Sequence, residues 1–120
     1  MTIRSYRDLE VWQKGLDLAV EIYRLAKLMP KAEEYRITSQ LLRAAASVPA
    51  NIAEGHVRCS RKEYAQHVSI ARGSLAETET FLMLAMRANL LPEAEATPAL
   101  ALAETIGRQL NVLRQRLSSP

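Results

Sequence analysis

The chain has 120 residues and a formal net charge of +3 at pH 7, with 48% hydrophobic and 5% aromatic residues. This length suits one domain, residues 1–120, around one core, and the scarcity of glycine and proline favours helices over a many-turned β fold. The apolar runs are too short to span a bilayer, the N-terminus lacks the apolar segment of a signal peptide, and the lone Cys59 cannot form an intrachain disulfide, so we expect a cytoplasmic protein.

The first predicted helix spans residues 6–28, between the capping-box spacing of Ser5 and Asp8 and the stop at Pro30. Its apolar residues form two stripes. The stripe assigned to the bundle core is Leu9, Trp12, Leu16, Ala19, Tyr23 and Ala26. A monomer needs only one stripe, so the second predicts an oligomer interface, although packing on another helix of the same bundle is the alternative. The residues of this predicted interface are Val11, Leu18, Leu25 and Ile22.

The second predicted helix spans residues 33–56 and contains an interior proline, Pro49. An interior proline removes one hydrogen bond and costs a helix about 3 kcal/mol, so packing on both sides must support this one. A row of small side chains beside Pro49 is expected to let a neighbouring helix approach closely. Gly55 is expected to mark the C-terminal stop.

Two further helices complete the predicted fold. The third spans residues 60–90, where Ser60 and Glu63 form a capping box, and the fourth spans residues 97–117, where Thr97 and Pro98 resemble a cap and a first-turn proline. The connections are short, so consecutive helices should run antiparallel. The sequence therefore predicts an all-α, antiparallel, up-down four-helix bundle.

Counting back through the turn between the second and third helices predicts a polar layer between them. Glu77 should face Arg43 in a partly buried ion pair, because a buried carboxylate needs such a partner. The same counting places Asn51 and Glu54 near Tyr64 and His67. The predicted layer, which would fix the register of the helices, is Gln40, Asn51, Glu54 and Glu77.

The basic residues are unevenly spread and predict a surface for a polyanion. Arg58, Arg61 and Lys62 at the second helix junction are the main candidates for binding RNA or DNA, with Arg36, Arg43 and Arg72 as secondary ones. Two alternatives remain open: the basic side chains only solvate helix surfaces, or the protein is a protein–protein adaptor or assembly scaffold with no nucleic-acid role.

The sequence contains no pattern that predicts catalysis or metal binding. There is no nucleophile–base–orienter set and no phosphate-cradling glycine loop, so we expect a non-enzymatic protein without a cofactor. Residues His56, Cys59, Glu63 and His67 recur in steps of three and four. The capping box at Ser60 interrupts any helix that would bring them together around a metal ion, so no metal site is predicted.

Several short segments resemble one bacterial family, the four-helix bundle proteins encoded within intervening sequences of 23S ribosomal RNA genes, and their free-standing relatives. These segments are residues 5–14, 41–43, 47–49, 51–55, 60–64 and 73–77, whereas the last helix matches only in pattern. The resemblance implies a homopentamer. A related bundle, the accessory variability determinant of diversity-generating retroelements, is also pentameric and binds nucleic acid and a reverse transcriptase through basic surfaces.

Overall fold

Four antiparallel helices make up the fold in the computed structural model, which describes residues 2–119. They are α1 (Glu10–Ala26), α2 (Ser39–His56), α3 (Arg61–Arg87) and α4 (Glu93–Ser118), and they form one bundle of 47 × 25 × 21 Å. Each helix packs on the next, and α4 packs on α1, so that α1 lies diagonally opposite α3. The predicted four-helix bundle is confirmed.

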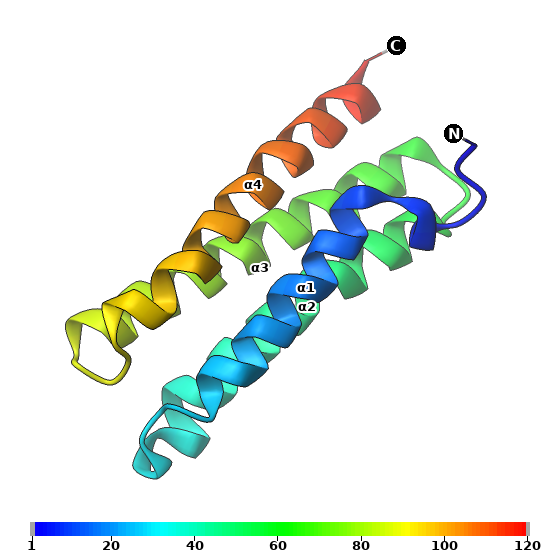
Figure 1. The fold of residues 1–120 in the computed structure, drawn as a ribbon. Helices are drawn as coiled ribbons and strands as arrows, with labels where there is room; N and C mark the ends of the chain where they lie inside the picture. The colour runs from blue at the N-terminus through cyan, green and yellow to red at the C-terminus, as the bar shows by residue number, and fades with distance from the viewer. Residues whose placement is uncertain (1, 120) are drawn as a thin grey trace.

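The two ends of the bundle differ in what they contain (Figure 1). Both chain termini and the α2–α3 turn lie at one end, which we call the terminal end. The α1–α2 and α3–α4 connections lie at the other, which we call the loop end. None of the helices within residues 2–119 has the length and apolar character to cross a membrane.

The two apolar stripes of α1 are exchanged relative to the prediction. The stripe assigned to an oligomer interface is buried inside the chain's own bundle, since Leu18, Ile22 and Leu25 are 0% exposed and Val11 is 8% exposed. That assignment is wrong. The stripe assigned to the core is the partly exposed one, with Leu16 40% and Tyr23 57% exposed. Helical periodicity reveals two apolar faces but does not show which one meets the other helices.

The chain enters α1 through an extra turn. The Ser5–Asp8 capping box is present, but it caps a short 3-10 turn at Tyr6–Asp8 rather than α1. Leu9 is extended, with φ −76° and ψ 123°, so α1 begins only at Glu10. The predicted start of this helix at residue 6 is therefore too early.

The start of α2 also differs from the prediction. A 3-10 turn at Lys31–Glu33 and a wider π turn at Glu34–Thr38 precede the regular helix, and Arg36 has non-helical φ −116° and ψ −114°. The exposed run Glu34–Arg36 carries no apolar residue that faces the core, so burial does not hold it in a regular helix. Thr38, at the end of the π turn, is nevertheless buried.

Pro49 lies within α2, where α1 approaches it closely. A Cβ atom added to Gly15 of α1 would lie 3.3 Å from the Cβ atom of Pro49. The absence of a side chain at Gly15 therefore lets α1 cover the proline, which supplies the packing that an interior proline requires. The predicted close approach at Pro49 is confirmed.

Gly55 is not the predicted helix stop. It lies inside α2, which continues to His56, and no glycine in residues 2–119 has a positive φ. A Cβ atom at Gly55 would lie only 2.7 Å from the Cβ atom of His67. Gly55 therefore serves the close contact of α2 with α3. Asn89, just after the end of α3, instead has the left-handed backbone conformation that is typical of a helix stop, with φ 59°.

The fourth helix begins at Glu93, four residues before the predicted start. Pro98 lies inside α4, and the hydroxyl of Thr97 donates to the carbonyl of Glu93 at 2.8 Å rather than capping a new helix. Pro98 leaves the carbonyl of Ala94 without its usual donor. Complete burial of Ala96 in this turn helps to offset that loss.

Candidate nucleic-acid interface

Positive charge is concentrated at the terminal end because three segments of the chain meet there. The segments before α1, around the α2–α3 turn and at the end of α4 are residues 2–9, 54–63 and 112–119. They carry seven basic side chains, namely Arg4, Arg7, Arg58, Arg61, Lys62, Arg114 and Arg116, against three acidic ones, Asp8, Glu54 and Glu63. The up-down topology thus joins basic residues that lie far apart in the sequence.

The loop end has no such excess. Its segments, residues 26–37 and 86–95, carry four basic and four acidic side chains. Arg36, predicted as a secondary nucleic-acid contact, lies in this part of the chain and its Nη1 atom is 3.6 Å from a carboxylate oxygen of Glu33. It therefore does not belong to the same surface as the residues of the α2–α3 turn.

The three main candidates lie together at the α2–α3 turn, but they are not equally available to a ligand. The guanidinium of Arg61 donates to the backbone carbonyls of Arg116 and Ser119 and so ties the end of α4 to the start of α3. Arg58 pairs with Glu54 at 2.8 Å. Lys62 has no carboxylate within ion-pair distance in residues 2–119.

The predicted set omitted the basic residues that the two chain termini bring to this end. Arg4, Arg7 and Arg116 are exposed and, like Lys62, have no carboxylate partner in the described chain. Arg114 is held by Ser69 of α3, because its Nε donates to the Ser69 hydroxyl at 2.9 Å. The signal that would have found them is the topology, which places the start of α1 and the end of α4 beside the α2–α3 turn.

The remaining candidates lie along the middle of the bundle. Arg43 of α2 bonds to Glu77 of α3 at 3.2 Å and to Gln40 at 3.0 Å. Arg72 is exposed on α3. Neither residue lies at the terminal end, so the structure does not bring the six predicted basic residues onto one surface.

The predicted polar layer exists as contacts between α2 and α3. Asn51 contacts the ring of His67 at 3.2 Å, and a carboxylate oxygen of Glu54 lies 3.6 Å from the same ring. The Arg43–Glu77 pair is more exposed than predicted, with 57% and 45% of the two side chains accessible. Its solvent exposure limits its contribution to stability. Whether the layer fixes the register of the helices stays a prediction.

The aromatic rings near the terminal end are engaged with one another. Tyr6 packs edge-on against Trp12 at a centroid distance of 5.2 Å, and His56 packs against Tyr64 at 5.6 Å. Burial raises the pKa of the Tyr64 phenol above its usual value. The basic surface therefore offers cations to phosphates, while the rings beside it pack edge-on against one another. Residues 2–119 contain no cluster of metal-ligating side chains.

Comparisons with known proteins identify relatives of the whole bundle. A family model described as 23S rRNA-intervening sequence protein matches residues 7–112. The chain is also similar to the crystal structure of a protein of unknown function from the S23 ribosomal protein family of Bacteroides thetaiotaomicron VPI-5482. The two chains are 26% identical with a TM-score of 0.79, over 91% of this chain and 99% of the other. No curated protein matches the chain.

Proposed function

Because this chain belongs to the 23S rRNA-intervening sequence protein family, we propose that it is a non-enzymatic protein that binds RNA or DNA. The observation that carries the proposal is the excess of seven basic over three acidic side chains at the terminal end. Because the loop end is balanced in charge, the excess positive charge lies at the terminal end of the bundle. A polyanion approaching such a molecule is drawn to one end.

The binding is expected to depend on phosphates rather than on base sequence. Arg4, Arg7, Lys62 and Arg116 are the exposed cations that no carboxylate neutralises in the described chain. Contacts from such side chains to phosphate oxygens supply affinity and position, and they carry no sequence information. The protein should therefore bind duplexes of unrelated sequence with similar affinity.

Charge reversal at the terminal end tests this function. We choose the variant Arg7→Glu, Lys62→Glu, Arg116→Glu, because these side chains are exposed and form no ion pair within residues 2–119. The matched control is Lys27→Glu, Lys31→Glu, Arg87→Glu, which changes the net charge equally at the loop end. Fluorescence anisotropy with a 20-base-pair RNA duplex at low ionic strength should show binding by the wild type and the control but not by the first variant.

Two results would contradict the proposal. One is the absence of binding by the wild-type protein at low ionic strength, and the other is equal loss of binding in both charge-reversed variants. Retention of a protein partner during purification, without retention of nucleic acid, would favour the alternative role as an adaptor. Arg58 and Arg61 are avoided because their replacement would also disturb the Glu54 pair and the end of α4.

We also propose that the protein self-associates into a homopentamer, as the resemblance of its sequence segments implies. The exposed face of α1 contributes Leu16 and Val20, which are 40% and 69% exposed. On the diagonally opposite helix α3, Ile70 and Leu84 are 49% and 51% exposed. Two different apolar faces on opposite sides of one subunit suit head-to-tail contacts, which are the contacts that close a ring with an odd number of subunits.

A further inference from the structure

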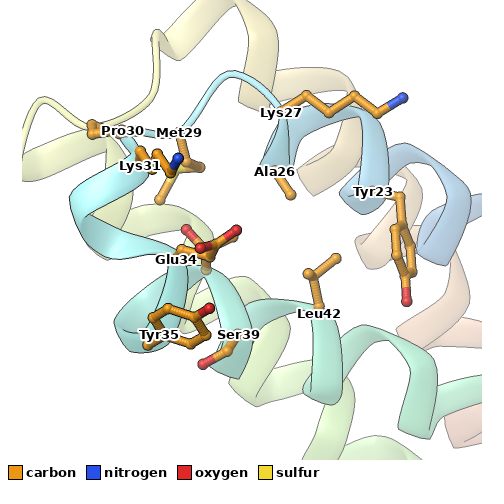
Figure 2. Close-up of a pocket in the computed structure, with 11 residues that line it drawn as sticks. Tyr23, Ala26, Lys27, Met29, Pro30, Lys31, Glu34, Tyr35, Ser39 and Leu42 are labelled. Atoms are coloured by element: carbon orange, nitrogen blue, oxygen red, sulfur yellow. The ribbon is translucent and has the colours of Figure 1, made fainter.

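A cavity lies at the loop end, in the groove between α1 and α2 (Figure 2). Its volume is about 460 Å³, within the range of sites for small organic molecules. Tyr23 and Ala26 of α1 face Leu42 of α2 across the gap, and Met29 closes one side. The walls are therefore mostly apolar, and the tyrosine ring forms one of them.

Charged groups stand only at the rim of this cavity. Lys27 extends along its upper edge, while Lys31 and Glu34 lie at its left side (Figure 2). Neither lysine has a carboxylate within ion-pair distance in residues 2–119. Two cations against one carboxylate leave a net positive rim above an apolar interior.

A buried hydroxyl without a partner lines the same cavity. Thr38 is 7% exposed, and its Oγ1 atom has no hydrogen-bond partner in the described chain. The other threonines within the helices, Thr78, Thr80, Thr97 and Thr105, all donate to the carbonyl four residues earlier. For Thr38 that carbonyl belongs to Glu34, at the start of the π turn, where the backbone leaves the regular helical path.

From the apolar walls, the positive rim and the unpaired hydroxyl, we propose that this cavity binds a small amphipathic organic anion. The apolar or aromatic body of the ligand lies against Tyr23 and Leu42, and its carboxylate, sulfonate or phosphate group faces Lys27 and Lys31. Glu34 opposes the anion and lowers the affinity. This inference does not depend on the binding of nucleic acid at the other end of the bundle.

The aromatic anion 1-anilinonaphthalene-8-sulfonate is a suitable probe, because its fluorescence rises when the rings leave water. Titration into the wild-type protein should saturate at one probe per chain. Lys27→Gln and Lys31→Gln should each weaken binding about two- to fivefold, as expected for one exposed charge contact, whereas Glu34→Gln should tighten it by a similar factor. Leu42→Trp, which fills the cavity, should abolish the saturable signal.

Lys14→Gln is the matched control, since it removes a cation of α1 far from the cavity and should leave binding unchanged. Circular dichroism establishes that each variant is folded. Failure of the wild type to bind the probe saturably would overturn the proposal. The proposal would also be overturned if Leu42→Trp still bound the probe and none of the three charge changes at the rim altered the affinity. The probe would then occupy another surface.

Discussion

Gly55 and Gly73 are both helical glycines, but their surroundings differ. A methyl group at Gly55 would meet the Cβ atom of His67 at 2.7 Å and the Cδ1 atom of Tyr64 at 3.0 Å. At Gly73 a methyl group would meet no atom within 4 Å. The same substitution therefore has opposite consequences at the two positions.

Gly55→Ala should lower the free energy of unfolding by about 1–2 kcal/mol, since overpacking outweighs the better helix propensity of alanine. Gly73→Ala should raise it by about 0.5–1 kcal/mol, because only the propensity changes. Urea denaturation followed by circular dichroism measures both. A stabilising effect of Gly55→Ala would show that α2 and α3 do not approach as closely as described.

Two glutamates have pKa values that move in opposite directions. Burial in α3 raises the pKa of Glu79 above 4.5, and the negative charge of Glu104 adds to the effect. The hydrogen bond from Arg24 lowers the pKa of Glu21 below 4.5, against a smaller effect of burial. The ionised form of Glu79 is thus disfavoured by folding, while that of Glu21 is favoured.

Glu79→Gln should therefore stabilise the protein at pH 7, and the gain should disappear as the pH falls through the raised folded-state pKa. Glu21→Gln should destabilise it at pH 7, and that difference should shrink as the pH falls through the lowered folded-state pKa. Thermal unfolding of both variants and the wild type between pH 7 and pH 3 gives the comparison. Parallel curves for wild type and Glu79→Gln would contradict the assigned cause.

At the scale of the helices, α1 shows what sequence patterns can and cannot predict. The two apolar stripes were visible, because periodicity depends only on spacing. Which stripe is interior depends on the rotation of α1 within the bundle, and the observed rotation places Gly15 of α1 against Pro49 of α2. The buried stripe is aliphatic, whereas the exposed one carries Trp12 and Tyr23, whose polar atoms can reach water.

Boundaries near proline were predicted less well than the helices themselves. Pro98 resembled a first-turn residue, but it lies inside α4, where the nearby residues Ala96 and Ala99 are completely buried. The π turn before α2 has no sequence signature of its own, so neither it nor the cavity beside it could be foreseen.

The exposed stripe of α1 leads to a prediction about assembly. Leu16→Glu combined with Val20→Glu should reduce the oligomer to smaller species while preserving helix content, since both side chains are exposed within the single chain. Sedimentation velocity measures the change. Val112→Glu on α4, where the side chain is 46% exposed, is the control and should leave the oligomer intact. A wild-type protein that sediments as a single chain would contradict self-association through this face.

At the scale of the whole molecule, the charge distribution follows from topology rather than from any one motif. The predicted main candidates Arg58, Arg61 and Lys62 are local in sequence and were found together. Arg4, Arg7 and Arg116 join them only because the first and last segments of the chain meet the α2–α3 turn. The sequence also overestimated how available Arg61 is to a ligand, because its guanidinium donates to backbone carbonyls at the end of α4.

The dependence of nucleic-acid affinity on salt tests the role of this end most directly. A plot of log K against log potassium chloride concentration for a DNA duplex should be linear with a negative slope, at about −0.9 for each phosphate neutralised. Replacing Lys62 and Arg116 by glutamine should reduce the slope by about 2 per bound chain, whereas replacing Lys27 and Lys31 should not change it. A flat plot, or equal slopes for the wild type and the terminal-end variant, would contradict binding through the basic end of the bundle.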